Sequence, residues 1–186
     1  MLFLKPTSSF LQNGGKIEIP KNCDVHHELE LGVIIGKTGR DISLQEANSF
    51  VDGYVLALDM TARNVQDQAK KKGHPWTVAK GYDTFTPIGS FIPKENIKNP
   101  KNLQLILKVD EQVKQNGSTA DMIFDIPTLI RHVSGIMTLE KGDLILTGTP
   151  SGVGPVSSGQ TVCGLLKDND TGKELSEIKF TVIDRK

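Results

Sequence analysis

Cysteine, aromatic residues, net charge and long apolar runs are all scarce in this chain. Its 186 residues include two cysteines, and aromatic residues make up 5% of the total. Cys23 and Cys163 stand apart, with no CxxC pair and no zinc-site spacing, so we expect no disulfide framework and a reducing compartment. The 22 basic and 22 acidic side chains cancel. This balance offers no electrostatic basis for binding nucleic acid or an anionic membrane.

No apolar segment approaches the roughly 18 residues that a membrane-spanning helix requires. The N-terminal residues have neither the charged and apolar regions of a secretory signal peptide nor the arginines of a transit segment. We find no internal repeat. The length is that of one domain with a sizeable core, so we expect residues 1–186 to form a single domain.

The most informative stretch is the acidic one at residues 26–32, HHELELG. On a strand, residues two apart point to the same face, so Glu28 and Glu30 would share one face and Leu29 and Leu31 the other. Two unpaired acids on one face repel each other and are costly to bury. A hard divalent cation with oxygen ligands would resolve this repulsion. A solvated edge strand with an acidic outer face is the alternative from the pattern alone.

A third acid, Asp59, ends the apolar run at residues 53–58 and precedes a predicted helix over 61–72 that stops at Gly73. An acid where a buried strand ends is a common position for a ligand. A helix N-cap is the alternative role. On the helix, Arg63 and Gln66 are three apart and share a face, where Arg63 is suited to gripping a carboxylate at two points. Arg63 could equally be exposed and paired with Asp67.

Two further candidates follow later in the chain. Lys80 comes after an apolar segment, and a partly buried lysine requires an anionic partner; a surface lysine with a buried stem is the alternative. Thr149 lies in a glycine-rich turn after the strand at 143–146, where backbone N–H groups can approach an anion. A plain tight turn is the alternative. The letters GTP at 148–150 are no nucleotide signal, because no P-loop lysine follows.

Period-2 segments outnumber helical ones, so the fold class expected is α+β and rich in β-strands. His132, on the third predicted helix, is expected to be structural or solvated. Strands are expected over 2–5, 16–20, 33–36, 53–58, 85–93, 103–109, 112–115, 143–146, 161–166 and 177–182, and helices over 43–51, 61–72 and 128–136.

Four segments together resemble the fumarylacetoacetate hydrolase superfamily, most closely its acylpyruvase/oxaloacetate decarboxylase branch. They are HHELELG at 26–32, GYVLALDMTARNVQ at 53–66, PWTVAKGYDTFTPIG at 75–89 and DLILTGTPSGVGP at 143–155. The resemblance covers nearly the whole chain. It implies a β-rich, mixed layered-sheet domain of the type found in the C-terminal part of fumarylacetoacetate hydrolases, with 1–186 as one catalytic domain.

The resemblance also implies roles for these residues. Glu28, Glu30 and Asp59 match acids that hold Mg²⁺ or Mn²⁺ in the family. The substrate-binding positions it implies are Arg63, Gln66, Lys80 and Thr149, with Lys80 also catalytic. It further implies a small 2-oxo acid as substrate, a homodimer, and a mitochondrial or cytosolic location.

Family members carry a segment before the stretch that matches Met1, with a mobile lid and a His–Glu pair that activates water. The chain as given begins after it, and His26 and His27 do not replace that pair. The activity expected is metal-dependent C–C cleavage: acylpyruvate hydrolysis, with oxaloacetate decarboxylation, which needs no attacking water, surviving the loss of the pair better. The alternatives are a weakened homologue that binds Mg²⁺ and dicarboxylates without turnover, and an isomerase of a related ring-opened 2-oxo acid.

Overall fold

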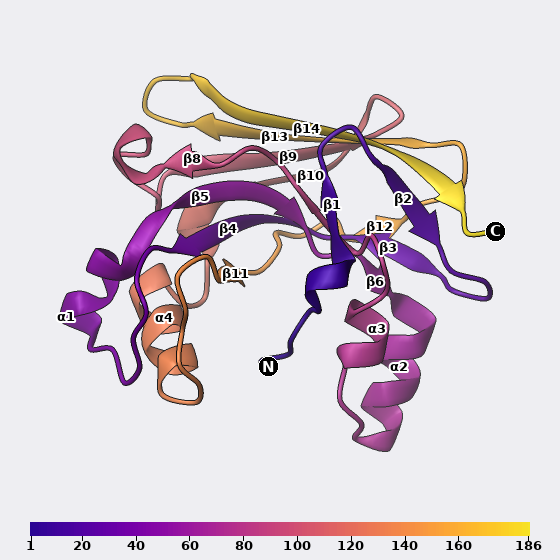
Figure 1. The fold of residues 1–186 in the computed structure, drawn as a ribbon. Coiled ribbons are helices and arrows are strands. Elements are labelled where there is room, and N and C mark those ends of the chain that lie inside the picture. The colour runs from indigo at the N-terminus through magenta and orange to yellow at the C-terminus, as the bar shows by residue number, and fades with distance from the viewer.

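The computed structural model describes residues 1–186 and consists of two stacked β-sheets, a small third sheet and four α-helices (Figure 1). The larger sheet has the order β1 (Phe10–Gln12), β7 (Thr86–Ile88), β5 (Val51–Leu58), β4 (Leu29–Ile35) and β11 (Leu144–Leu146), with β8 (Ile92–Pro93) also paired to β5. The second has the order β10 (Gln112–Ser118), β9 (Leu103–Val109), β13 (Thr161–Asp168), β14 (Glu174–Asp184) and β2 (Lys16–Ile19). The third is β12 (Gly154–Pro155), β3 (Val25–His27) and β6 (Thr61–Ala62).

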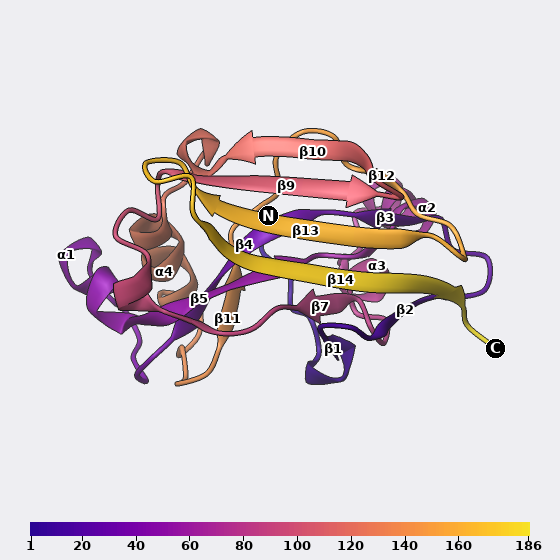
Figure 2. The ribbon, with the colours of Figure 1, turned by 90° about the horizontal axis from the view of Figure 1, so that it is seen from above.

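The helices lie on the side of the larger sheet that faces away from the second sheet (Figure 1). They form two groups at opposite ends of it, with the N-terminal segment between them. Figure 2 shows the five-stranded sheet from above, covering the larger sheet. The helices are α1 (Leu44–Ala47) and α4 (Ile126–Ser134) in one group, and α2 (Arg63–Lys72) and α3 (Thr77–Lys80) in the other. None of these helices has the length and apolar character needed to cross a membrane.

Pairing between β4 and β5 separates the apolar from the acidic side of the larger sheet. Leu29 lies opposite Leu58, and Leu31 lies opposite Leu56, so these side chains share one face. Both leucines of β4 are fully buried. Glu30 lies opposite Ala57 on the other face. The alternation predicted for residues 28–31 is therefore confirmed.

The core lies between the two large sheets and continues to α4 on the helix-bearing side. It is one cluster of 31 buried hydrophobic residues drawn from both sheets and from α4. At Gly164 on β13 a β-carbon would lie 2.8 Å from Leu29 of β4, so the missing side chain is what lets the sheets approach here. The two layers thus fix the strand that carries the acids.

Most local predictions are confirmed. Ser43 caps α1 by accepting from the Glu46 backbone N–H, and Gly73 ends α2 in a left-handed conformation at φ 65°. The hairpin between β9 and β10 turns through Asp110 and Glu111, both at positive φ, as a two-residue turn of this handedness requires.

Four local predictions differ from the structure. The strand expected over 85–93 is divided into β7 and β8, and the helix expected over 43–51 ends as α1 at Ala47, with a 3₁₀ turn before β5 begins at Val51. Residues 2–5 form no strand, because the segment has no ladder partner and precedes Pro6. The helix predicted from residue 61 starts at Arg63, since Thr61–Ala62 pairs with β3 as strand β6. The short helix α3 was not predicted; its four residues are too few for a helical period to be visible.

Truncating a core leucine tests this layering. Leu31→Ala should lower the free energy of unfolding by about 2–5 kcal/mol, because the fully buried side chain leaves a cavity between the sheets. Leu44→Ala, at a 41% exposed position on α1, should change it by less than about 0.5 kcal/mol. Urea denaturation measures both, and equal effects would contradict the assigned core.

Candidate metal centre and substrate pocket

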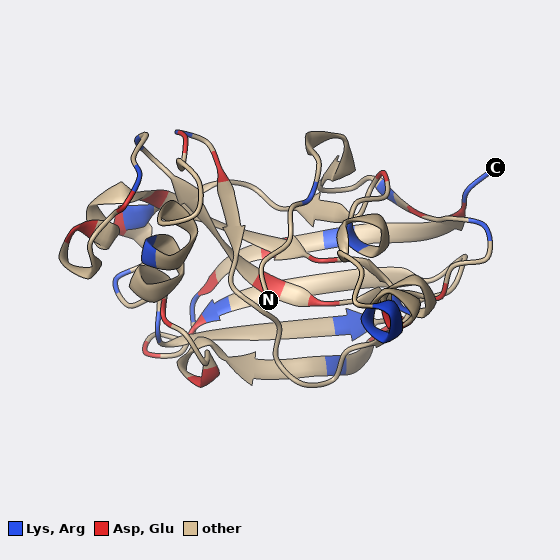
Figure 3. Ribbon diagram, turned by 90° about the horizontal axis from the view of Figure 1, so that it is seen from below, with Lys and Arg blue, Asp and Glu red and all other residues tan.

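Three acidic side chains, two at the start of β4 and one just after β5, meet on the helix-bearing side of the larger sheet. Glu28, Glu30 and Asp59 each offer a carboxylate oxygen, and these atoms all lie within 4.8 Å of one another. Glu28 joins β3 to β4, Glu30 belongs to β4, and Asp59 follows β5. The Asp59 backbone N–H donates to the Glu28 carbonyl at 2.8 Å, which keeps the two strand ends in register. Acidic positions in the central strands are visible from below in Figure 3.

Two lysine ammonium groups lie among these carboxylates. Lys80 Nζ donates to Glu28 Oε2 at 2.9 Å and to Asp59 Oδ2 at 2.5 Å, and its side chain is 2% exposed. Lys5 Nζ donates to Asp59 Oδ1 at 2.7 Å and to the Lys80 carbonyl at 2.6 Å. Asp59 is therefore an ion-pair partner of two lysines and does not cap α2, whose N-cap position is Ala62.

Arg63 and Gln66 lie at the same site, at the first turn of α2. Arg63 donates from Nη2 to Glu28 Oε1 at 2.6 Å, from Nη1 to Gln66 Oε1 at 2.5 Å and from Nε to His26 Nδ1 at 3.4 Å. The partner that the sequence suggested, Asp67, instead pairs with Lys70. A guanidinium has five N–H groups, so two of those on Arg63 remain for a ligand.

Glu30 differs from the other two acids because no cation pairs with it directly. Its Oε2 accepts from the Gly148 backbone N–H at 2.6 Å. Burial, followed by the negative charge of Asp59, raises the pKa of Glu30 to about 8. Burial alone would also raise the pKa of Glu28, but Lys80 and Arg63 bring it below its ordinary value. The site thus holds a carboxyl group that only a further cation would keep ionised at neutral pH.

The donor set fits a hard divalent cation. It consists of carboxylate oxygens alone, the ligands that Mg²⁺ and Mn²⁺ prefer, with no thiol or imidazole among them. The raised pKa of Glu30 shows that the cations already present do not fully compensate the acids. Glu28, Glu30 and Asp59 are therefore close enough to coordinate one divalent cation, and their role as metal ligands stays a prediction.

The glycine-rich loop at 147–150 lies beside Glu30. Thr147 Oγ1 donates to the Leu31 carbonyl at 2.8 Å, and Thr149 Oγ1 donates to the Leu29 carbonyl at 2.8 Å. These bonds hold the loop along β4. The Thr149 hydroxyl is thus engaged with the backbone, and its predicted contact with substrate stays a prediction.

Sequence reasoning missed Lys5. It precedes Pro6 in a segment interpreted as a strand, and nothing near it in the sequence is acidic. Its partner, Asp59, is 54 residues away. The only sequence signal is a lysine with no acidic residue nearby, and this signal is not specific because the chain has many such residues.

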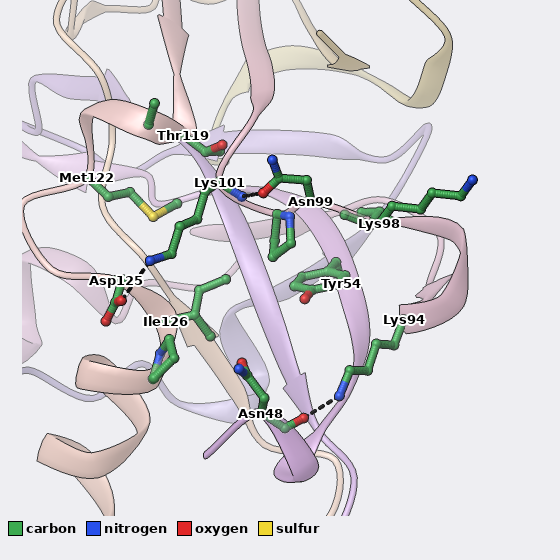
Figure 4. Close-up of a pocket in the computed structure, with 14 residues that line it drawn as sticks. Asn48, Tyr54, Lys94, Lys98, Asn99, Lys101, Thr119, Met122, Asp125 and Ile126 are labelled. Carbon is green, nitrogen blue, oxygen red and sulfur yellow. Dashed lines mark hydrogen bonds and ion pairs between the residues drawn. The ribbon is translucent and has the colours of Figure 1, made fainter. Parts of the chain in front are cut away.

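Several hollows lie outside the acidic cluster. One, of about 460 Å³, is lined by Lys94, Lys98, Lys101 and Tyr54 near the start of α4 and contains none of the site residues (Figure 4). Lys94 there donates to the Asn48 carbonyl. A second, of about 360 Å³, runs between the N-terminal segment and β11, and Lys5 forms part of its wall. A third hollow, of about 410 Å³, is lined by His26 and Arg63, so both it and the second reach residues of the site.

Comparison with known proteins identifies the family to which the chain belongs. Residues 1–181 match the family model described as fumarylacetoacetate (FAA) hydrolase C-terminal, and the chain belongs to this family. It is 58% identical to the mitochondrial oxaloacetate decarboxylase of Dictyostelium discoideum, over 99% of this chain and 83% of that protein. It is 55% identical to the mitochondrial oxaloacetate tautomerase FAHD1 of Arabidopsis thaliana, over 98% and 79%.

Solved structures agree with this assignment. A fumarylacetoacetate hydrolase family protein from yeast superposes with a TM-score of 0.92 at 37% identity, covering 99% of this chain and 85% of that one. The resemblance inferred from the four sequence segments and the β-rich α+β fold class are therefore confirmed.

The titration of Glu30 predicts how stability depends on pH in chelator-treated protein. The folded state binds this proton more tightly than the unfolded state, because the pKa rises from 4.5 to about 8 on folding. The contribution of Glu30 to stability is therefore complete below pH 4.5 and is lost as the pH rises towards 8. Glu30→Gln, which cannot ionise, should flatten this decline. Urea denaturation at several pH values measures it, and parallel profiles for the two proteins would contradict the assignment.

Proposed function

We propose that this chain is a divalent-metal-dependent enzyme acting on small 2-oxo dicarboxylic acids, with oxaloacetate decarboxylation as its main reaction. The observation that carries the proposal is the acidic triad with its cationic neighbours. The names of the relatives, an oxaloacetate decarboxylase and an oxaloacetate tautomerase, support the substrate class.

The charge balance of the site favours a doubly negative ligand. Three carboxylates, those of Glu28, Glu30 and Asp59, are matched by three cationic side chains, from Lys5, Lys80 and Arg63. A bound divalent cation would leave two positive charges in a largely buried pocket. Such charges are costly without counter-charges, and a dicarboxylate supplies two.

The chemistry proposed is stabilisation of an enolate. A divalent cation on the triad would supply Lewis acidity towards the 2-oxo group. Lys80, whose ammonium lies between Glu28 and Asp59, would add positive charge near the developing enolate. Arg63 would bind a carboxylate through its two remaining N–H groups, and Gln66 holds the guanidinium in place from one turn along α2. Thr149 and its loop would orient the other end of the substrate.

Keto–enol tautomerisation of oxaloacetate is the second candidate, favoured by the tautomerase at 55% identity. It also passes through an enolate at the 2-oxo group, but this enolate forms by loss of a C3 proton and not of CO₂, so no carbon–carbon bond breaks. Acylpyruvate hydrolysis is a third activity of this proposal, and it additionally needs an activated water. Binding of Mg²⁺ and dicarboxylates without turnover is the outcome that would reduce the protein to a binding module.

One assay series separates these activities. Purified chain is given oxaloacetate, and separately acetylpyruvate, with Mg²⁺ or Mn²⁺ and then with excess chelator. Pyruvate formed from oxaloacetate reports decarboxylation, loss of the enol absorbance without pyruvate reports tautomerisation, and acetate from acetylpyruvate reports hydrolysis. We expect chelator-sensitive pyruvate formation. Metal-dependent oxalate binding with none of these products would overturn the proposed activity.

Glu30→Gln should abolish metal-dependent turnover, because the amide keeps the shape of the side chain but removes the charge that holds the cation. Glu177→Gln is the matched control, an exposed acid on β14 that is remote from the triad. Steady-state rates and Mn²⁺ binding by calorimetry check this. Undiminished turnover in Glu30→Gln would end the claim of metal dependence.

The proposal extends to organisation and location. One contiguous core supports treating residues 1–186 as a single catalytic domain, and the names of the relatives support a mitochondrial location. A homodimer is also proposed, since Ile123, Phe124 and Ile136 are exposed apolar residues flanking α4.

Sedimentation equilibrium tests the dimer. The wild type should sediment at twice the chain mass, and Phe124→Ser should shift the equilibrium towards monomer by removing apolar contact area. Val113→Ser, a comparably exposed apolar position on β10, is the control. A monomeric wild type would contradict the homodimer.

A further inference from the structure

The Gln115 side chain leaves its own sheet and reaches the loop beside the acidic triad. It belongs to β10, the edge strand of the five-stranded sheet, whose residues 112–114 are exposed. The register of β10 shifts between Val113 and Gln115, and such a bulge redirects the following side chains. Gln115 is consequently 1% exposed.

All four hydrogen-bonding positions of the Gln115 amide are used. Its Oε1 lies 3.0 Å from the Leu29 backbone N–H donor and 3.0 Å from His27 Nδ1. Its Nε2 donates to Thr149 Oγ1 at 2.7 Å and to the Pro150 carbonyl at 2.9 Å. A primary amide offers two N–H groups and two acceptor positions, so this side chain joins β10, β4 and the loop with nothing left over.

The orientation of the amide follows from its partners. The Leu29 N–H can only donate and the Pro150 carbonyl can only accept, so exchanging the oxygen and nitrogen of Gln115 would lose both bonds. His27 Nδ1 must then be a donor, which makes the ring the Nδ1–H tautomer. The Thr149 hydroxyl accepts from Gln115 and directs its own proton to the Leu29 carbonyl.

The loop held in this way is the one that contacts Glu30. Gly148, directly before Thr149, donates its N–H to Glu30 Oε2 at 2.6 Å. Thr147, the residue before Gly148, donates from Oγ1 to the Leu31 carbonyl. The loop is therefore attached to β4 through the hydroxyls of Thr147 and Thr149, and its C-terminal side is attached in addition to β10 through Gln115.

Close backbone packing shows that β10 and this loop form one unit. A β-carbon at Gly117 would overlap the Pro150 ring, and one at Gly152 would overlap the Lys114 carbonyl oxygen. Gly152 also has φ +98°, which side-chain-bearing residues rarely adopt. Two glycines thus permit the approach that the Gln115 amide then ties together.

We propose that Gln115 is a positioning residue, which holds the 147–150 loop so that Gly148 and Thr149 are presented to the triad and to the substrate. The expected effect on turnover rests on the proposed function, whereas the expected effect on the position of the loop does not depend on any activity. Gln115 makes no hydrogen bond to a triad carboxylate; it acts through the loop.

The test compares Gln115→Met with Thr119→Val. Methionine keeps the length and volume of the side chain and removes all four hydrogen bonds. Thr119 is a matched control: it is 2% exposed, it binds both the N–H and the carbonyl of Leu103 in the same sheet, and it does not contact the loop. Both variants lose buried hydrogen bonds, but only one loses the attachment of the loop.

The first readout is amide hydrogen exchange in chelator-treated protein without substrate. The Gly148 amide should exchange about tenfold faster, or more, in Gln115→Met than in wild type, because the loop opens locally. In Thr119→Val its exchange should stay at the wild-type rate. Gly148 exchange that is equal in the two variants would overturn the proposal.

The second readout is a double-mutant cycle on kcat/KM for oxaloacetate. Gln115→Met should lower it about tenfold or more, since small displacements of positioning groups are costly, and Thr119→Val should leave it unchanged. If Gln115 acts through Thr149, adding Gln115→Met to Thr149→Val should cost much less than in wild type. Fully additive losses would overturn this route.

Further controls keep the outcomes distinct. If Gln115→Met does not fold, Gln115→Glu replaces it, because it retains the acceptor oxygen towards Leu29 and loses the donor towards Pro150; the same two readouts apply. A wild-type chain without turnover would defeat the proposed function, while the exchange result would still decide the role of Gln115.

Discussion

Electrostatic repulsion among three buried carboxylates is the constraint on which the arrangement of the site depends. Their oxygens lie within 4.8 Å of one another, and each can be ionised only if a positive charge or a hydrogen-bond donor is close by. The fold supplies these from four directions: the N-terminal segment through Lys5, α2 through Arg63, α3 through Lys80, and the 147–150 loop through the Gly148 N–H. Glu28 and Asp59 each have two cationic partners, whereas Glu30 has the Gly148 backbone N–H.

Neighbouring positive charges do not compensate the three carboxylates equally. Glu28 and Asp59 have direct cationic partners, whereas Glu30 has only a backbone N–H and a pKa of about 8. A cluster built only for stability would gain from pairing or replacing this acid. An unpaired acid beside two ion-paired ones therefore supports the proposal that the site binds a metal ion in place of a proton.

The two-layer architecture gives this cluster a rigid base. Leucines on one face of β4 are buried between the sheets, while Glu30 on its other face belongs to the acidic triad. Strand alternation thus makes one short segment serve the core and the site together. The five-stranded sheet also supports the site, because Gln115 of its edge strand donates hydrogen bonds to Thr149 and Pro150 in the loop beside Glu30.

The amino-acid sequence alone determined those features that depend on neighbours a few residues apart. The alternation at 28–31, the cap at Ser43, the end of α2 at Gly73 and the hairpin after residue 109 all follow from local periodicity and turn chemistry. The candidate residues Glu28, Glu30, Asp59, Arg63, Gln66 and Lys80 were likewise named from the sequence, and the structure brings them to one place.

Tertiary structure decided which partners those residues have. Lys5 meets Asp59 across 54 positions, Gln115 meets Leu29 across 86, and Gly148 meets Glu30 across 118. No periodic signal spans such distances, because each contact depends on how the sheets stack and where the loop crosses β4. The sequence could therefore indicate a site that attracts a cation, whereas the stacking of the sheets determined how that site is neutralised and held.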